Sequence, residues 1–357
     1  MQKRLFLRKI YDSDILHALI NLKQIVFEVT DGCNLRCKYC GYADLYGGYD
    51  KRENKNLSFD KAKKIIDYLA GIWKEHCSNS LVMPLTLGFY GGEPLMNMKL
   101  IKQIIDYADS LNLTGKQLFF SMTSNAMLLN KYMDYLADKK FSLLISLDGD
   151  EYAQSYRTDH NGVNSFVRVI NNINLLREKH PEYFDKHVNF NSVLHNRNSV
   201  EGIYYFIRET FGKETTISSL NTSGIRKDKI EEFRKTYMNM LESLNQASDY
   251  RQLQKDMFIR NVYTSELLHY IHNSTGNVFD DFNQLFFDKE NFPVRLTGTC
   301  IPFAKKMFVT VNGKIIQCER INHEFALGSI SDKGVELDLK AAADRYNGYI
   351  FRFVEQC

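Results

Sequence analysis

The 357-residue sequence has no long hydrophobic run and little net charge. No stretch approaches the roughly 18 uninterrupted apolar residues that a transmembrane helix needs. The basic segment at residues 1–10 contains no long apolar run, so it is not a signal peptide. A net charge of +3 gives no reason to expect nucleic acid or an anionic membrane as a partner. We therefore expect a cytoplasmic globular protein with no membrane partner.

The cysteines are too few and too unevenly distributed for a disulfide framework. Their number is seven, and an odd count in a long chain without an export signal argues against such a framework. Three of them, Cys33, Cys37 and Cys40, fall within eight residues. This clustering favours a metal site.

The first half of the sequence alternates short apolar segments with amphipathic ones. Strands are predicted at residues 24–29, 85–90, 117–123, 141–147, 187–194 and 215–220. Helical patterns lie between them, for example at 59–73 with Ser58 as the N-cap. This alternation predicts an α/β fold with a parallel sheet, and six repeats are too few for a closed eight-stranded barrel. We expect an open, partial (βα)6 TIM-like barrel with functional residues at the C-terminal ends of its strands.

The pattern divides the chain into four regions: an N-terminal extension (1–23), the barrel (24–222), a helical linker (223–296) and a strand-rich segment (297–357). Residues 228–274 look helical and charged, which favours a connector over a binding module. In the last region, Asn312-Gly313 between apolar runs predicts a hairpin.

The clustered cysteines have the spacing C-x3-C-x2-C and follow directly on the first predicted strand. Three thiolates on one loop can ligate three irons of a cubane cluster, which leaves the fourth iron open to a substrate or cofactor. A structural zinc site would need four ligands, and the nearest candidates, His76 and Cys77, lie at the end of a separate helix. Zinc or a redox thiol remains the alternative.

This loop resembles the signature of the radical S-adenosylmethionine (radical SAM) superfamily. The resemblance implies a 4Fe–4S cluster on Cys33, Cys37 and Cys40 whose open iron binds S-adenosylmethionine. It also implies reductive cleavage to a 5′-deoxyadenosyl radical, which takes a hydrogen atom from the substrate. Tyr39 would lie near the adenine. The chemistry implies an electron donor such as flavodoxin or ferredoxin.

Two further strand ends carry motifs of the same superfamily. Tyr90-Gly91-Gly92-Glu93-Pro94 matches the motif that binds the amino group of the methionine moiety. Its glycines let backbone approach a ligand, and its carboxylate can accept from an ammonium. Thr123-Ser124-Asn125 resembles the Thr-Asn-Gly segment, although Ser124 is inserted and Ala126 replaces glycine. Asn125 is therefore a candidate cofactor residue, and a simple turn is the alternative for either segment.

Ser146-Leu147-Asp148-Gly149 ends the fourth predicted strand, with Ser146 and Asp148 on one face. The resemblance implies that these two side chains hold a carboxylate and a ribose diol; the alternative is a turn with a helix-capping Asp. Arg157 would bind a substrate or cofactor carboxylate, or form a surface ion pair. Weaker candidates for cofactor binding lie on the fifth and sixth strands: Asn191 and Leu220.

The C-terminal cysteines have the spacing of an auxiliary-cluster domain of the SPASM or twitch type. Cys300, Gly313 and Cys318 match its C-x9–15-G-x4-C opening, and Cys357 stands where a later cysteine is expected. A full SPASM domain would continue with several more cysteines, so we expect a truncated or rudimentary domain. Cys300, Cys318 and Cys357 could hold one auxiliary cluster; ordinary core cysteines are the alternative.

Members with this C-terminal pattern mostly act on peptides or proteins. The leading hypothesis is a maturase of ribosomally synthesised peptides that forms a crosslink or related modification. Maturation of sulfatases, which oxidises an active-site Cys or Ser, is the alternative within the class. A degenerate iron–sulfur protein that serves as a scaffold or in electron transfer is the alternative outside it. No catalytic base can be named from the sequence.

Overall fold

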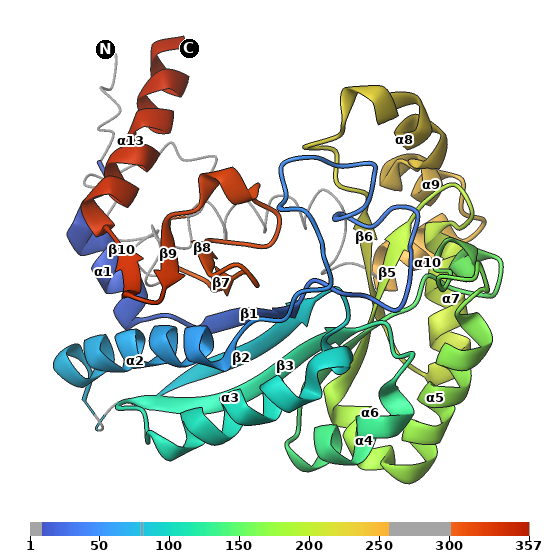
Figure 1. Cartoon of the computed structure of the whole chain (residues 1–357). Coiled ribbons are helices and arrows are strands. Elements are labelled where there is room, and N and C mark those ends of the chain that lie inside the picture. The colour runs from blue at the N-terminus through green and yellow to red at the C-terminus, as the bar shows by residue number, and fades with distance from the viewer. Residues whose placement is uncertain (1–8, 79, 81, 257–300, 357) are drawn as a thin grey trace.

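The computed structural model describes residues 9–78, 80, 82–256 and 301–356, and a curved sheet lies at its centre (Figure 1). Its first six strands are β1 (Gln24–Thr30), β2 (Met83–Gly91), β3 (Lys116–Ser124), β4 (Ser142–Ser146), β5 (Val188–Leu194) and β6 (Thr215–Ser219). Neighbours in this order pair in parallel, and β6 lies at one edge of the sheet. The predicted open barrel of six parallel strands is thus confirmed.

Each predicted strand is present, with ends shifted by no more than two residues. β1 shows why the prediction works, because its residues are apolar enough to be buried on both faces, as parallel strands are. Ile25, Phe27 and Val29 enter the main core between sheet and helices. Val26 and Glu28 alternate with them and face the inner side of the curve.

Helices cover the outer side of the sheet (Figure 1). They are α2 (Phe59–His76), α3 (Met98–Ser110), α4 (Leu129–Asp138), α5 (Phe166–Lys179), α6 (Pro181–His187) and α7 (Val200–Phe211). α2 begins as predicted, because the Ser58 hydroxyl accepts from the Lys61 amide at 3.3 Å. Its apolar stripe, which includes Ile65, Leu69 and Trp73, is buried against the sheet.

The region after β6 contains three short helices in its described part: α8 (Ile230–Thr236), α9 (Met240–Asn245) and α10 (Tyr250–Asp256). α9 and α10 pack near α7 and contribute Leu244 and Leu253 to a small core with it. The predicted helical connector is therefore present as separate helices up to residue 256. The rest of the predicted linker lies outside the described residues.

The C-terminal strands continue the same sheet beyond β1. They are β7 (Met307–Val309), β8 (Lys314–Ile316), β9 (Gly328–Ser331) and β10 (Gly334–Leu337), followed by α13 (Leu339–Gln356). β7 pairs in parallel with β1, so the full order is β10-β9-β8-β7-β1-β2-β3-β4-β5-β6. The predicted hairpin joins β7 and β8, with Gly313 at φ +84° in its turn. β7, buried throughout, covers the edge that β1 would otherwise expose, so the C-terminal strands join the barrel sheet directly.

The N-terminal extension also belongs to this body. Helix α1 (Asp12–Ile20) packs against α2 and α13 (Figure 1). The Trp73 indole donates to the Leu19 carbonyl at 3.0 Å, and the Asn347 side chain exchanges two hydrogen bonds with the Ile10 backbone. The four domain boundaries stay predictions, since these contacts join regions that the sequence pattern separates. No helix among the described residues is long and apolar enough to cross a membrane.

A loop at residues 41–56, here called the bridging loop, crosses the mouth of the open barrel (Figure 1). At one side the Gly47 amide donates to the Gly224 carbonyl, beyond β6, at 2.9 Å. At the other side Asp50 accepts from Lys314 (2.6 Å) and Asn312 (2.8 Å) of the C-terminal hairpin. The bridging loop thus connects the two flanks of the opening.

Candidate functional site

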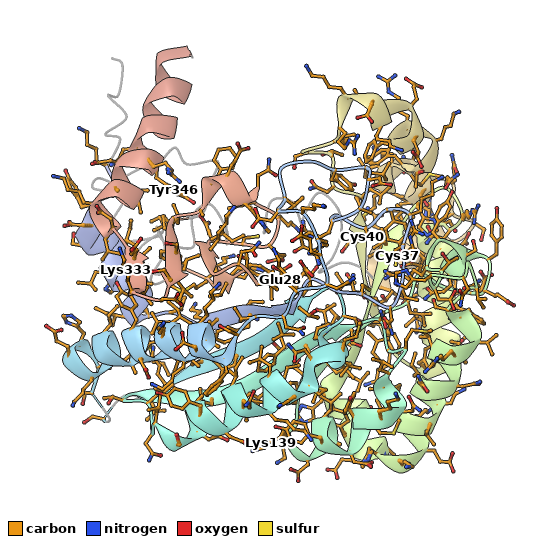
Figure 2. All side chains as sticks on the ribbon, in the orientation of Figure 1. Glu28, Cys37, Cys40, Lys139, Lys333 and Tyr346 are labelled. Carbon is orange, nitrogen blue, oxygen red and sulfur yellow. The ribbon has the colours of Figure 1, made fainter. Side chains whose placement is uncertain are left out.

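Three free cysteines lie on the loop that leaves the C-terminal end of β1: Cys33, Cys37 and Cys40. Figure 2 labels Cys37 and Cys40 on this loop. Two backbone hydrogen bonds fasten this cysteine loop, residues 31–40, to the chain beyond β4. The amides of Arg36 and Lys38 donate to carbonyl oxygens in the segment 156–158, at 2.7 and 3.1 Å. The loop therefore lies at the strand end where the sequence predicted function.

The cysteines suit a cluster better than a single ion. No group of three His, Cys, Asp or Glu side chains in the described part of the chain is close enough to hold one metal ion. The thiols are nevertheless near enough to raise one another's pKa. Burial raises the pKa of Cys33 to about 11 and that of Cys37 to about 12, with further contributions from the neighbouring cysteines. Thiols that bind different irons of one cluster need this looser arrangement, and bound metal would deprotonate them.

Gly91 and Gly92 bring the end of β2 against the cysteine loop. The Gly92 amide donates to the Thr30 carbonyl and the Glu93 amide to the Gly32 carbonyl, both at 2.9 Å. A Cβ on Gly91, whose φ is +138°, would lie 2.1 Å from the Thr30 oxygen, and one on Gly92 would lie 2.0 Å from the Gly32 oxygen. The backbone that these glycines approach is thus the end of β1 and the start of the cysteine loop.

Glu93 is buried at the centre of this junction, with 1% of its surface exposed. Its carboxylate accepts from the Leu95 amide (3.1 Å), the Ser124 hydroxyl (2.8 Å) and the Asn125 amide (2.7 Å). Burial raises the pKa of Glu93 to about 7, and these three hydrogen bonds only partly oppose the rise. The carboxylate therefore lacks a cationic partner among the described residues, which suits a site for an ammonium group.

Asn125 lies beside Glu93 and contacts the cysteine loop. Its side-chain amide donates to the Asn34 side chain at 2.7 Å and lies 3.8 Å from the Cys33 sulfur. Ala126, where the resemblance implies glycine, is buried with φ +60°, in the region that glycine adopts most easily. Ser124, which sequence reasoning treated as an insertion, supplies the side-chain hydroxyl that donates to Glu93.

Tyr39, Asp148 and Arg157 form one buried network. The Arg157 Nε and Nη2 atoms donate to the two carboxylate oxygens of Asp148 at 2.9 and 3.1 Å, and the Tyr39 hydroxyl donates to the same carboxylate. Burial opposes ionisation, but Arg157 and the other donors hold the pKa of Asp148 at about 2. The ion pair of Arg157 is therefore buried, in contrast to the surface pair that sequence reasoning offered as one alternative. The cofactor roles of these three residues stay predictions.

Sequence reasoning gave no role to His195, which lies at this network, or to His160, which lies at the cysteine loop. His195, which follows β5, is fully buried; its ring stacks on Tyr39 with centroids 5.3 Å apart, and its Nε2 lies 3.6 Å from Asp148. The His160 Nε2 atom lies 2.9 Å from the Cys33 carbonyl. The position of His195 directly after a predicted strand was the available signal.

The remaining candidates are Ser146 at the end of β4, Asn191 in the middle of β5 and Leu220 just after β6. Ser146 pairs in register with Asn191, whose side chain accepts from the Ser218 hydroxyl at 3.0 Å. Leu220 is buried in an apolar cluster that includes Tyr39. The contacts of all three candidates with a cofactor stay predictions.

Comparison with known proteins identifies the family. The profile of the radical SAM superfamily matches residues 27–205, half of the chain, including the cysteine loop. The chain belongs to the radical SAM superfamily. Such enzymes use a 4Fe–4S cluster and S-adenosylmethionine, and Cys33, Cys37 and Cys40 are the residues that would hold the cluster.

Curated radical SAM enzymes are similar to this chain over part of their length. It is 27% identical to the cysteine-type anaerobic sulfatase-maturating enzyme of Clostridium novyi, over 53% of this chain and 48% of that enzyme. It is 26% identical to the radical SAM cyclopropyl synthase TigE of Paramaledivibacter caminithermalis, over 48% and 35%. The chain thus matches about half or less of the length of these relatives.

A solved structure, native anSMEcpe with bound AdoMet and a peptide, shares the fold. The TM-score is 0.57 at 17% identity, and the match covers 91% of this chain and 80% of that one. This supports the partial barrel together with its C-terminal extension as a radical SAM architecture.

A cavity of about 290 Å³ opens on the inner side of the radical SAM barrel. Its wall includes Tyr90 of β2 and, from the C-terminal hairpin, Lys306 and Glu319, whose ion pair measures 2.6 Å. Burial works against ionisation of Glu319, but Lys306 outweighs it and lowers the pKa of this carboxyl. Burial raises the pKa of Tyr90, and the charges of Glu319 and Cys40 raise it further.

Of the three cysteines predicted to hold an auxiliary cluster, only Cys318 lies among the described residues. Cys318 follows β8, is partly buried, and its thiol has a pKa raised by burial. The pKa of Tyr49 is raised mainly by burial, and the charges of Cys318 and Cys40 both raise it further. Cys300 and Cys357 lie outside the described residues, so the auxiliary cluster stays a prediction.

Proposed function

We propose that this radical SAM enzyme modifies a peptide, and that it is a maturase of ribosomally synthesised peptides that forms a crosslink or a related modification. The observation that carries the proposal is the cavity of about 290 Å³ whose wall includes Tyr90. It opens on the inner side of the barrel, and the C-terminal hairpin supplies an ion pair to its wall. A side chain projecting from a peptide fits about 290 Å³, whereas a whole folded protein surface does not.

The cluster and S-adenosylmethionine, when bound, supply a 5′-deoxyadenosyl radical that removes a hydrogen atom from the substrate. Glu93 would accept from the ammonium of the methionine moiety, because it is a buried carboxylate that has no cationic partner among the described residues. A two-electron oxidation also requires loss of one proton and one electron. Glu319, the carboxylate among the described residues of the cavity wall, would take the proton, and the electron would return to an iron–sulfur centre.

Maturation of sulfatases is the second candidate. Cysteine-type and serine-type anaerobic sulfatase-maturating enzymes are both among the similar proteins, at 24–28% identity. Their substrates would present a Cys or Ser side chain to the same cavity. A low-potential donor such as flavodoxin or ferredoxin would supply the initiating electron in either case.

The first experiment measures radical initiation alone. Iron-reconstituted protein is incubated without oxygen with S-adenosylmethionine and dithionite, and 5′-deoxyadenosine is followed by chromatography. The wild type should form it, and Cys37→Ala should not. Absence of product in both proteins, with about four irons bound per chain, would instead favour the scaffold or electron-transfer alternative.

The second experiment separates the two substrate classes. Peptides encoded beside the gene and sulfatase-derived peptides are offered in parallel, each deuterated at the β-carbon of Cys or Ser. Deuterium in 5′-deoxyadenosine identifies the hydrogen donor. A new aldehyde identifies sulfatase maturation, and a crosslinked fragment in the mass spectrum identifies peptide maturation. Hydrogen abstraction only from a small metabolite would exclude both.

A further inference from the structure

The carboxylate of Asp148 is fully occupied by the protein. Oδ1 accepts from Arg157 Nη2 at 3.1 Å and from the Val193 amide at 2.9 Å. Oδ2 accepts from Arg157 Nε at 2.9 Å and from the Tyr39 hydroxyl, and His195 Nε2 lies 3.6 Å away. An ionised carboxylate offers about four lone-pair sites, and four donors fill them here. The side chain has no solvent-exposed surface.

His195 packs against this arrangement. Its ring stacks on Tyr39 with an interplanar angle of 30°, and its Nε2 lies 3.6 Å from Asp148 Oδ2. The Arg197 amide donates to its Nδ1 at 3.1 Å, and the Asn198 side-chain amide lies 3.4 Å from its Nε2. These contacts hold the His195 ring against Tyr39 and beside the Asp148 carboxylate.

The network connects parts of the chain that are far apart in sequence. Tyr39 stands between two cluster cysteines, Asp148 follows β4 and His195 follows β5. For Asp148 to turn toward a ribose, the buried Arg157 guanidinium and Tyr39 hydroxyl would lose their partner. A buried charge without a partner is strongly unfavourable, so the geometry opposes that movement.

We propose that Asp148 and His195 are positioning residues, which fix Tyr39 and with it the cysteine loop, and that Asp148 does not bind the ribose of S-adenosylmethionine. This departs from the ribose role that the resemblance implied for Asp148. The cofactor then binds a loop whose geometry the protein has already set. Its ribose hydroxyls find their partners elsewhere at the barrel mouth.

The test compares binding of two ligands, so it does not depend on any peptide substrate. Affinities for S-adenosylmethionine and its 2′,3′-dideoxy analogue are measured by equilibrium dialysis on oxidised, cluster-loaded wild type and Asp148→Asn. For each protein the affinity for S-adenosylmethionine is divided by the affinity for the dideoxy analogue. The two ratios should agree within about twofold, because the ribose hydroxyls do not contact residue 148. A wild-type ratio of about tenfold (about 1.4 kcal/mol) that disappears in the variant would overturn the proposal.

A second measurement applies even where Asp148→Asn does not fold. Electron paramagnetic resonance spectra of the reduced cluster are recorded before any S-adenosylmethionine is added. Tyr39→Phe and His195→Leu should each alter the spectrum, the double variant should add nothing further, and His195→Gln, which keeps a donor, should restore it. Tyr46→Phe is the matched control, since its hydroxyl bonds the Asn221 carbonyl in the same apolar cluster. Wild-type spectra for Tyr39→Phe and His195→Leu would refute the positioning role.

Discussion

The buried carboxylate of Glu93 makes the stability of the protein depend on pH in a predictable direction. Its pKa rises from an ordinary value of 4.5 to about 7 because burial penalises the charged form. A carboxyl with a raised folded-state pKa contributes stability that is fully present below pH 4.5 and is lost as the pH rises through about 7. The rise corresponds to about 3 kcal/mol of unfolding free energy.

The change that isolates this effect is Glu93→Gln, which cannot titrate. Glutamine offers one acceptor where glutamate has two, so the variant also loses a hydrogen bond at every pH. The quantity to compare is therefore the pH dependence. Relative to wild type, the unfolding free energy of the variant should increase by about 3 kcal/mol between pH 5 and pH 8.

Urea unfolding of the apoprotein, followed by the fluorescence of Trp73, measures this difference. Trp73 is the single tryptophan of the sequence and is fully buried, so its signal reports the folded core. Curves for wild type and variant that run parallel from pH 5 to pH 8 would refute the raised pKa.

Binding of S-adenosylmethionine gives an independent check on the same carboxyl. The ammonium would pair with ionised Glu93, so below about pH 7 the wild type must release one proton that Glu93→Gln does not. A plot of log affinity against pH should be steeper for the wild type by one unit in that range. Equal slopes would separate Glu93 from the ammonium site.

Three further changes test other parts of the site. Gly92→Ala should destabilise the fold by about 3 kcal/mol or more, because its Cβ would lie 2.0 Å from a cysteine-loop carbonyl. The same variant should incorporate less iron. The control is Gly71→Ala in α2, which has open space around it and should stabilise the fold by about 0.5–1 kcal/mol in the same urea assay. Arg52→Met should lower the unfolding free energy by about 3–5 kcal/mol, because it leaves the buried Glu28 carboxylate without the guanidinium that lies 2.8 Å away. Adding Glu28→Gln to this variant should recover part of the lost free energy. Glu319→Gln should leave 5′-deoxyadenosine formation without substrate unchanged and slow peptide conversion by about 10²–10⁴-fold, and equal losses in both assays would contradict its place in the substrate cavity.

The sequence predicted the six barrel strands because each is a short apolar segment bounded by amphipathic helices. β1 is the clearest case, since five of its seven residues are apolar or β-branched and the cysteine loop follows it at once. The C-terminal hairpin was equally visible at Asn312-Gly313. What periodicity could not reveal is that β7 pairs with β1, because pairing of distant strands depends on which edge is left open.

The same limit explains the residues that sequence reasoning missed. Ser124 contacts Glu93 and His195 contacts Asp148, and each partner is more than 30 residues away in the sequence. A local sequence pattern cannot predict such contacts. Glu28 offered a signal, because a charged residue inside an apolar strand needs a buried partner. Its partner, Arg52, lies in the bridging loop, where spacing carries no information.

Three parts of the chain hold the cysteine loop through contacts of their own. The Glu93 amide bonds the Gly32 carbonyl, the Asn125 side chain bonds Asn34, and the network at Asp148 holds Tyr39. Each such contact restricts the conformational freedom of the loop. The bridging loop follows Cys40 directly in the chain, and its Asp50 is hydrogen-bonded to the C-terminal hairpin. A movement of that hairpin would therefore be transmitted to the cysteine loop through these hydrogen bonds and the connecting backbone. A cofactor site built in this way depends on contacts at the ends of β2, β3, β4 and β5, which is why its residues are spread over more than 160 positions although they meet at one mouth.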